Sequence, residues 1–387
     1  MYTSSTRGYK SGGDFTALLI HTHTHNNLTF PPDPNMSTQT ALLVAEFNKP
    51  VTKTTTWPIP TPGPKQLLLR VTVAALNPHD QKVRDWGFFF KDDLPTPLAN
   101  DFAGVVTATG SAVTKFSVGD RVFTYGNWLE PGHFQNGLVE YATTDEAFAE
   151  KVPEHLTEHD VVTLPVNVSA SAIGLFDEKF GLGIPAPWTA AAKTFDYAHT
   201  TLLVVGGGSN CGRLAVQLAK LAGIAHIVVL GGKEAELKAW GATHVVDRHG
   251  SDVAVQARIA SAVGSDLVYV FDAVNGADTL YVGINALSST RRGKVARLIP
   301  TAPPATAKVL KKEGEYVVTE VYGMPHDVAL GKGLWANLGA YVREGRIAPL
   351  RYEVAEGVGL DADRVNKVLD RYRDGEAVVQ THFRVSE

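Results

Sequence analysis

The chain has 387 residues, 44% of them hydrophobic and 20% charged, which suits a soluble globular protein of two or three domains. Its 36 basic and 40 acidic residues give a net charge of −4, so it lacks the positive excess that nucleic-acid binding needs, and it has no run of 18 apolar residues to span a membrane. The single cysteine fits the reducing cytoplasm, where we expect the protein to reside, and excludes an internal disulfide and any zinc site built from two or more cysteines.

Residues 1–35 are rich in polar and turn-forming residues, and we predict a flexible extension with no part in the chemistry. Their one apolar run, residues 17–20, is too short for the core of a signal peptide. Alternating histidines would allow metal binding, although a solvated tail is the simpler interpretation. These histidines are His21, His23 and His25.

Residues 36–165 are predicted to be rich in β-strands. Apolar and polar residues alternate over 66–75, so that Leu67, Leu69 and Val71 would share one face of a strand. The proline-rich segment 58–64 cannot be helical and is predicted to be an edge loop. Strand-like segments fall at 41–46, 66–75, 101–110, 120–125 and 137–143.

After residue 165, short buried strands alternate with amphipathic helices, which is typical of a parallel sheet with helices on both faces. The strands are expected at 201–205, 227–230, 245–246, 267–271 and 294–299. The helices are expected at 168–180, 213–222, 233–240, 252–263, 277–288 and, after Gly323, at 330–344. The fold class is therefore α/β, a doubly wound parallel sheet beside a β-rich domain, with a mixed C-terminal segment.

A glycine-rich turn follows the buried strand 201–205 and leads directly into a helix. Set against the dinucleotide-binding pattern, Gly207 takes the first glycine position, Ser209 the second and Gly212 the third. Serine is small enough for a pyrophosphate to approach, and its hydroxyl is expected to donate to it. A structural turn without a ligand is the alternative. The cofactor contacts expected here are Gly207, Gly208, Ser209, Asn210, Cys211 and Gly212.

The end of the second parallel strand distinguishes the two nicotinamide dinucleotides, because NAD sites place an acidic residue there for the ribose 2′-hydroxyl. Here the place reads Leu-Gly-Gly-Lys, ending at Lys233, and Arg248 follows the next strand. Two cations and no acid favour the 2′-phosphate of NADPH. Glu234 and Glu236, in the following helical turn, would instead reach the ribose of NADH.

Further motifs occur in a fixed order from Met36 to the C-terminus. They are Asn77-Pro78-His79-Asp80 with Lys82, the segments 97–106, 110–113, 118–122, 217–220 and 241–247, and Phe271-Asp272-Ala273-Val274-Asn275-Gly276. Together with the nucleotide turn, they resemble the medium-chain dehydrogenase/reductase superfamily, in its zinc-free branch of quinone oxidoreductases and enoyl reductases.

The resemblance implies a GroES-like catalytic domain, residues 36–165 and 323–387, that is interrupted by a Rossmann domain, residues 166–322, which binds NADPH. It also implies that Lys233 and Arg248 occupy the 2′-phosphate positions. Among relatives, the chain looks most like fungal reductases of secondary metabolism, including trans-acting enoyl reductases that serve polyketide synthases.

The chain departs from the zinc-dependent alcohol dehydrogenases of this superfamily. Asn77-Pro78 stands in the region of their first cysteine ligand, and Asn100-Asp101 replaces their His-Glu pair. Without these ligands no zinc would hold an alkoxide, so we expect no metal site and no alcohol oxidation by the zinc route. The tyrosine that some enoyl reductases carry after the Asn-Pro turn is also missing, because that region reads Trp-Gly-Phe-Phe-Phe.

Reduction of an activated C=C bond requires a group that holds the enolate oxygen and one that supplies a proton. The catalytic candidates are Lys82, His79 and Tyr125; a surface lysine, a histidine that caps a turn and a pocket wall are the respective structural alternatives. Asn77, Val274 and Asn275 are expected beside the cofactor, the last through its backbone. Asp80 and Asp101 are interpreted as braces of turns, and Cys211 as a small packing residue and not a nucleophile.

These features predict an NADPH-dependent, zinc-independent reductase of an enoyl thioester, an enone or a quinone. An aromatic group would either line a cleft for a large hydrophobic substrate, with delivery by an acyl carrier protein as one route, or belong to the core. Its members are Trp86, Phe88, Phe89, Phe90 and Trp128. The alternatives are a carbonyl or alcohol dehydrogenase without zinc and a non-catalytic NADPH-binding accessory protein. Both a monomer and a homodimer are open.

Overall fold

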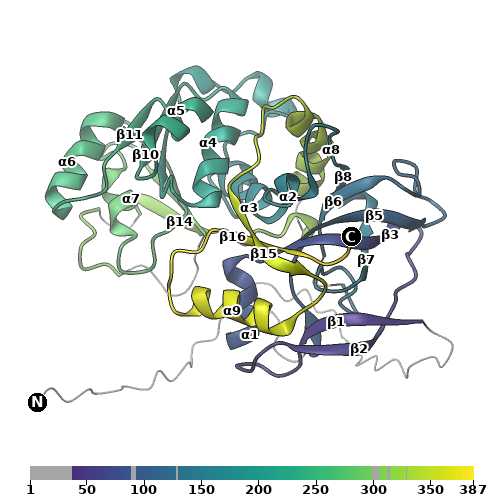
Figure 1. Cartoon of the computed structure of the whole chain (residues 1–387). Helices are drawn as coiled ribbons and strands as arrows, with labels where there is room; N and C mark the ends of the chain where they lie inside the picture. The colour runs from purple at the N-terminus through teal and green to yellow at the C-terminus, as the bar shows by residue number, and fades with distance from the viewer. Residues whose placement is uncertain (1–36, 89–92, 128–129, 299–304, 312–313, 328) are drawn as a thin grey trace, which may run out of the picture. The chain divides into compact units, whose positions relative to one another are not determined.

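The computed structural model describes residues 37–88, 93–127, 130–298, 305–311, 314–327 and 329–387, whose path is shown in Figure 1. The expected N-terminal extension with its histidines lies outside these residues, as do Phe89, Phe90 and Trp128 of the aromatic group. Among the described helices, none combines the length and the apolarity that a membrane span requires.

The β-rich part of the described chain contains a mainly antiparallel sheet in the order β15-β16-β3-β5-β6-β8, with β7 paired to β3. Its strands are β3 (Gln66–Ala75), β5 (Asp101–Thr109), β6 (Arg121–Tyr125), β7 (Tyr141–Asp145), β8 (Ala149–Lys151), β15 (Tyr352–Val358) and β16 (Gln380–Arg384). A smaller antiparallel sheet has the order β2-β1-β4, from β1 (Thr38–Val44), β2 (Thr52–Pro58) and β4 (Thr96–Pro97).

Strand β3 occupies the whole predicted span, and its alternation has the expected consequence: Leu67, Leu69 and Val71 are fully buried on one face. The end of the chain returns to this sheet, since β16 pairs with β3 through His382 opposite Ala75. Figure 1 shows yellow β16 beside purple β3. The C-terminal segment therefore completes the sheet that carries β5 and β6.

The second sheet is parallel throughout, in the order β11-β10-β9-β12-β13-β14. Its strands are β9 (Thr201–Val205), β10 (His226–Leu230), β11 (His244–Val246), β12 (Tyr269–Asp272), β13 (Gly293–Arg297) and β14 (Tyr316–Glu320). The helices between them are α4 (Asn210–Ala222), α5 (Glu234–Trp240), α6 (Asp252–Val263) and α7 (Tyr281–Ala286).

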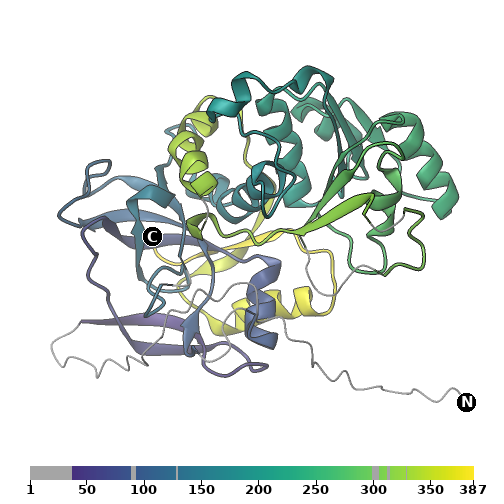
Figure 2. The same cartoon turned by 180° about the vertical axis from the view of Figure 1, so that it is seen from behind.

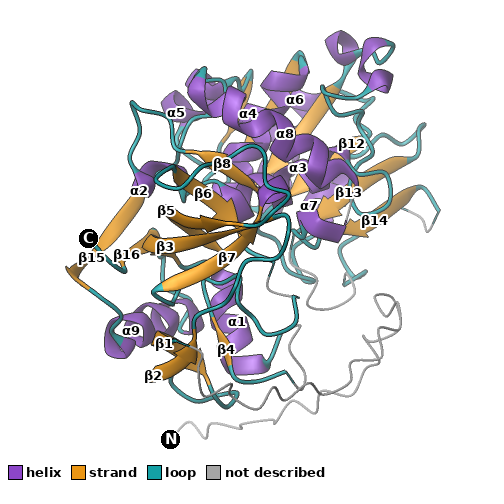
Figure 3. Ribbon diagram, turned by 90° about the vertical axis from the view of Figure 1, so that its right-hand side faces the viewer, coloured by secondary structure: helices purple, strands orange, loops and turns teal. Residues whose placement is uncertain are grey.

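Helices pack on both faces of this sheet, and Figure 3 draws them in purple beside the orange strands. The side chains of the central strand β9 explain this arrangement. Leu202 and Val204 pack into the cluster that holds the apolar side of α4, whereas Leu203 and Val205 pack into the cluster of α6 and α7. Because both faces are covered, the strand is apolar without alternation, as predicted for a buried parallel strand.

The remaining helices are α1 (Pro78–Trp86), α2 (Glu158–Val161), α3 (Pro165–Phe176), α8 (Ala329–Arg343) and α9 (Ala362–Arg373). Helix α1 lies beside α9 in both Figure 1 and Figure 2, and the buried Arg84 of α1 forms an ion pair with Asp370 of α9 at 2.8 Å. Helix α3 packs against α4 and also against α8.

The structure corrects several sequence predictions. The Asn-Pro-His-Asp motif opens helix α1 instead of forming only a turn. The strand expected at 137–143 lies at β7, the helix expected at 168–180 is α3, which begins at Pro165, and the helix expected at 277–288 shortens to α7. The mixed C-terminal segment consists of β15, α9 and β16. Its helix α9 buries Val365, Val368 and Leu369 along one side.

Candidate active site

The nucleotide turn between β9 and α4 has the close backbone approach that its glycines predict. A Cβ atom on Gly207 would lie 2.3 Å from Val229 Cγ1, and one on Gly212 would lie 2.2 Å from the Gly206 carbonyl oxygen. Gly206 itself has a φ of +92°, a conformation that favours glycine. A Cβ on Gly208, in contrast, would meet no heavy atom closer than 3.7 Å, so this residue leaves room for a ligand.

Ser209 is the N-cap of helix α4. Its Oγ accepts a hydrogen bond from the Gly212 amide at 3.0 Å and donates to the Gly206 carbonyl at 2.8 Å. The one hydroxyl proton is therefore used inside the turn, in contrast to the expected donation to a pyrophosphate. Within the described chain, the amides of Asn210 and Cys211 at the start of the helix have no acceptor, and they fit an anion at the positive end of the helix dipole.

Lys233 and Arg248 lie at the same edge of the parallel sheet. Leu230 of β10 stands opposite Val246 of β11, so the residues after the two strand ends are neighbours. The Cδ atom of Arg248 would lie 3.0 Å from a Cβ on Gly231, which places the arginine stem beside the end of β10. Both cations are exposed, and neither forms an ion pair with another described residue.

The carboxylates near these cations are engaged elsewhere. Glu234 forms an ion pair with Lys238 at 2.7 Å, which lowers the pKa of Glu234. Glu236 lies 3.5 Å from Arg213 and 3.4 Å from Arg351. The two acids that would suit the ribose of NADH thus have cationic partners of their own.

Val274 and Asn275 follow strand β12, and Val274 touches the nucleotide turn. A Cβ on Gly206 would lie 2.5 Å from Val274 Cγ1, although the Val274 side chain remains partly exposed. The Asn275 amide donates to the buried Asp272 carboxylate from its side chain at 2.8 Å and from its backbone at 2.9 Å. Asn275 thus uses its backbone N–H and one side-chain N–H within the protein, and its contact with a cofactor stays a prediction.

The start of helix α1 is a capping box. Asn77 is the N-cap, Pro78 takes the first helical position, and the Asp80 carboxylate accepts the Asn77 backbone amide at 2.7 Å. The other oxygen of Asp80 accepts the Ala99 amide at 2.9 Å. Asp80 thus braces two segments, as expected.

The side chain of Asn77 lies inside a buried polar network. Its amide donates to Asp101 at 2.8 Å, and its oxygen accepts from Gln380 of β16 at 3.2 Å and from Asn167 of α3 at 3.4 Å. Only 2% of Asn77 is exposed. The predicted cofactor residue therefore has its side chain committed to the protein.

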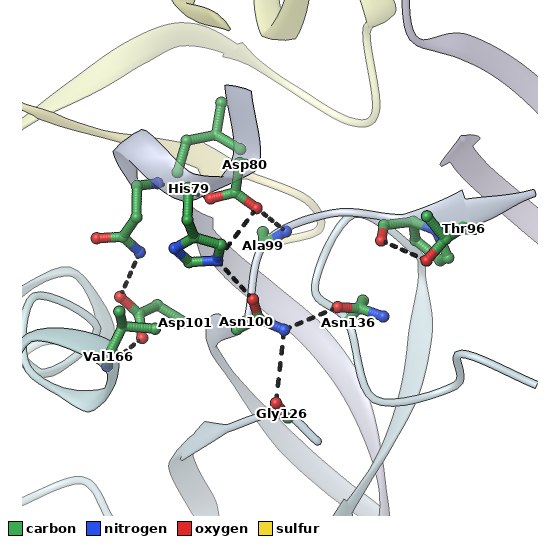
Figure 4. A network of polar contacts seen from close by, with 12 residues as sticks. His79, Asp80, Thr96, Ala99, Asn100, Asp101, Gly126, Asn136 and Val166 are labelled. Atoms are coloured by element: carbon green, nitrogen blue, oxygen red, sulfur yellow. Dashed lines mark hydrogen bonds and ion pairs between the residues drawn. The ribbon is translucent and has the colours of Figure 1, made fainter. Parts of the chain in front are cut away.

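Asp101 accepts hydrogen bonds from three segments and has no cationic partner in the described chain. Its donors are Asn77, Gln380 at 3.2 Å and the Val166 amide at 2.7 Å; the last is drawn in Figure 4. Complete burial outweighs these donors and raises the pKa of Asp101 to about 8. The side chains of Asn77, Asn100 and Asp101 thus bond to other protein groups, and no group of three metal-ligating side chains occurs among the described residues.

Helix α3 links this network to the nucleotide turn. The Cys211 thiol lies 3.5 Å from Asn167 Oδ1, and Ser171 Oγ lies 2.9 Å from the Cys211 carbonyl oxygen. Although the residue as a whole is partly exposed, the thiol is enclosed, and this raises the pKa of Cys211 to about 12. The thiol thus stays protonated at neutral pH, in line with a packing role.

His79, the residue after Pro78, is 25% exposed at its side chain. Its Nε2 lies 2.7 Å from Asn100 Oδ1 and 3.8 Å from Asp80 Oδ1 (Figure 4). Asn100 is in turn bound to Asn136, whose Oδ1 is 3.0 Å from the Asn100 amide nitrogen. The imidazole of His79 is therefore partly exposed, whereas the side chains that hold it are buried.

Lys82 lies one helical turn after His79, on the same side of α1. Its ammonium is 5.7 Å from the centre of the Phe88 ring, and burial lowers the pKa of Lys82. No carboxylate of the described chain pairs with it. Trp86 of the aromatic group is 65% exposed, whereas Phe88 is partly buried under the lysine.

Tyr125 ends strand β6, opposite Asp101 of β5, and is only 3% exposed. Its ring centre is 5.4 Å from that of His326, which also packs on Phe148. Burial lowers the pKa of His326 to about 3, so this histidine is neutral. The buried position of Tyr125 therefore favours a role as a wall of the pocket over a role as a catalytic acid.

Three residues of the site are absent from the sequence predictions: Asn136, Asn167 and Gln380. Gln380 and Asn167 contact Asn77 although they are 303 and 90 residues away from it in the sequence. An amide side chain inside a mostly apolar helix, such as Asn167 in α3, is the one signal that the sequence carries for them.

Profile comparison places two known domains on the chain. The alcohol dehydrogenase GroES-like domain matches residues 63–154, and the domain named zinc-binding dehydrogenase matches residues 211–298. The chain is 30% identical to the dehydrogenase mokE of Monascus pilosus over 344 residues, 84% of this chain and 91% of the relative. It is 30% identical to a trans-enoyl reductase of Fusarium mangiferae over 275 residues, 63% and 69% of the two chains.

A third relative is the enoyl reductase component of the lovastatin nonaketide synthase of Aspergillus terreus, 27% identical over 90% of this chain and 95% of the relative. Solved structures share the fold. The CurK enoyl reductase has a TM-score of 0.69 at 16% identity, over 90% of this chain and 99% of that one. A quinone oxidoreductase of Coxiella burnetii has a TM-score of 0.65 at 21% identity, over 90% and 100%. The chain therefore belongs to the medium-chain dehydrogenase/reductase superfamily of oxidoreductases, among the relatives of the fungal trans-enoyl reductases.

Proposed function

We propose that the protein is an NADPH-dependent reductase of an activated C=C bond, in an enoyl thioester, an enone or a quinone. The contact between Asn77 and Asp101 carries this proposal. An amide and a carboxyl group that bond to each other form a poor zinc site, and reduction of an activated double bond needs no Lewis acid to hold an alkoxide. Hydrogen-bonding groups that stabilise an enolate suffice.

The residues of the Rossmann part fit the cofactor. The amides of Asn210 and Cys211 would hold the pyrophosphate, and the space at Gly208 admits its approach. Lys233 and Arg248 would bind the 2′-phosphate, because no neighbouring carboxylate competes for them. When bound, NADPH supplies the hydride that the β-carbon of the substrate receives.

The residues of α1 would serve the substrate. Lys82 offers an ammonium without an anionic partner in the described chain, which suits the developing negative charge on a carbonyl oxygen. His79 stands one turn before it, within reach of the same substrate. The names of two relatives, an enoyl reductase component of a polyketide-type synthase and a trans-enoyl reductase, support an acyl substrate that a carrier protein delivers.

The test is NADPH oxidation with a panel of enoyl thioesters, enones and quinones, with NADH as the control and products identified by mass. We expect saturated products, a strong preference for NADPH, and rates that a chelator leaves unchanged. An alcohol as the product would replace this proposal with carbonyl reduction. Tight NADPH binding without turnover of any acceptor would favour the accessory role.

A further inference from the structure

Two asparagines and two backbone carbonyls determine which nitrogen of His79 carries the proton. His79 Nε2 is 2.7 Å from Asn100 Oδ1, the Asn100 amide nitrogen is 3.0 Å from Asn136 Oδ1, and the Asn136 amide nitrogen is 3.4 Å from the His133 carbonyl. The Asn100 amide also faces the Gly126 carbonyl at 3.5 Å, and Figure 4 shows the part of this chain from His79 to Asn136.

The carbonyl oxygens fix the direction of the chain, because a carbonyl only accepts hydrogen bonds. Rotating both amides by 180° would set oxygen against oxygen at Gly126 and at His133. The amide nitrogens therefore face these carbonyls, and Asn100 Oδ1 faces the imidazole. Both asparagines are buried, with 3% and 1% exposed, so water does not replace the lost bonds.

We propose that Asn100, oriented by Asn136, holds His79 with a proton on Nε2 and thereby directs Nδ1 to the substrate as the site of proton transfer. Asn100 and Asn136 are positioning residues, and His79 is the catalytic acid. Within the described chain Nδ1 has no partner, whereas Nε2 is bound. The catalytic half of the inference rests on the proposed function; the assignment of the proton does not.

Titratable groups from three elements lie around His79 and its partner Asn100. The Asp80 carboxylate lies 3.8 Å from Nε2 on the same helix and is itself buried. Asp101 neighbours Asn100 on β5, and Tyr372 of α9, whose pKa is raised by burial and by Asp80, stays neutral. The like charge is Lys82, one turn along α1.

His79 lies in a segment that a series of side-chain contacts connects with the nucleotide turn. Cys211 in the turn contacts Asn167, and Asn167 contacts Asn77, two residues before His79. Such a place is suited to a group that acts on a substrate lying against the cofactor.

In the proposed proton transfer, the Nδ1–H group of His79 is the donor and the α-carbon of the substrate is the acceptor. Once the β-carbon has received its hydride, the electron pair of the C=C bond resides on the carbonyl oxygen as an enolate. The α-carbon of the enolate forms a C–H bond with the proton of the Nδ1–H group, and the N–H electron pair remains on Nδ1. His79 is then neutral with its proton on Nε2, and solvent reprotonates Nδ1.

Nitrogen NMR of the full chain with 15N-labelled histidine tests the first half without turnover. At a pH where His79 is neutral, we expect the proton on Nε2 in the wild type and a mixture of both tautomers in Asn100→Ala. A proton on Nδ1 in the wild type would overturn the inference, whatever the enzyme's activity.

The second half is tested with the N-acetylcysteamine thioester of crotonic acid and NADPH in D2O. The wild type should place deuterium on one face of the α-carbon. His79→Gln should lower kcat by about 100-fold or more and lose the facial selectivity, while the Kd for NADPH stays within about twofold. His155→Gln, at an exposed loop position, is the matched control and should behave as the wild type. Unchanged kcat and selectivity in His79→Gln would refute the acid role, whereas a wild type that reduces no acceptor would refute the proposed function and the acid role together.

Discussion

Asn77 donates a hydrogen bond to Asp101 over 2.8 Å, and neither residue is more than 2% exposed. This one contact joins the start of helix α1 to strand β5. Gln380 adds strand β16 to the same two residues. Three segments that are far apart in the sequence therefore meet at one carboxyl group.

Asp101 makes the stability of the protein depend on pH in a defined direction. Its pKa is about 8 in the folded chain, against about 4 when unfolded, so the native state binds the extra proton between these values. The free energy of unfolding should fall as pH rises through this range, by up to about 1.4 kcal/mol per pH unit from this group. Urea unfolding from pH 5 to 9 should show this slope in the wild type and a smaller one in Asp101→Asn; equal slopes would contradict the burial argument.

Lys233 and Arg248 should distinguish the two dinucleotides. Replacing both with alanine removes two charged donors at the expected 2′-phosphate, and we expect the Kd for NADPH to rise by about 100-fold or more. The Kd for NADH should change by less than about threefold. Lys238→Ala, which removes only the partner of Glu234, is the control. Equal losses for both dinucleotides in fluorescence titrations would show that the two cations do not bind the phosphate.

Alanine substitutions at Gly207 and Gly208 should have different effects: the first on stability, the second on ligand binding. Gly207→Ala places a methyl group 2.3 Å from Val229 and should destabilise the fold by roughly 2 kcal/mol or more. Gly208→Ala meets nothing closer than 3.7 Å, so Tm should change little while the affinity for NADPH falls. If Gly208→Ala binds NADPH as the wild type does, the pyrophosphate does not pass over this residue.

Lys82 is expected to lower the stability of the folded protein and to raise the rate of the reaction. Because burial lowers its pKa, the charged form is disfavoured in the folded chain, and stability should rise as pH passes upward through that lowered pKa toward 10.4. Lys82→Met should therefore raise Tm at pH 7 by about 1–2 °C and abolish this rise. The reduction rate should fall by about 100-fold if the ammonium holds the enolate oxygen. A faster or unchanged rate would assign that role elsewhere.

Cys211 should be inert in the folded protein. With a pKa of about 12, its thiolate fraction at pH 8 is on the order of 1,000-fold below that of a free cysteine. Iodoacetamide should label it at a correspondingly low rate in the native state and completely in urea. Because it is the only cysteine of the chain, intact-mass measurement reads the result directly. Fast native labelling would mean that the thiol is open to solvent.

The parts of the molecule that follow from local pattern could be predicted from the sequence. The apolar run of β9, the alternation of β3 and the glycines of the nucleotide turn each express a constraint within a few neighbouring residues. Helix α1 belongs to this class too, since Asn77 and Asp80 have the spacing of a capping box, although an Asn-Pro pair on its own favours a turn.

The polar network could not be predicted in this way. Gln380 and Asn167 carry no motif, and only the pairing of β16 with β3 and the packing of α3 bring them to Asn77. The role of Glu236 is similar, because the cations that engage it, Arg213 and Arg351, come from two distant segments. Side chains whose meaning depends on long-range partners are fixed by tertiary packing and not by local spacing.

Helix α3 has a consequence for the evolution of the enzyme. Asn167 contacts Asn77 on one side and Cys211 on the other, so a substitution at either end changes the surroundings of the same amide. Mutations that reshape the substrate end and mutations that retune the nucleotide turn should therefore be epistatic, although Asn77 and Cys211 share no contact of their own. Selection for a different substrate would then favour variants in which both ends change together.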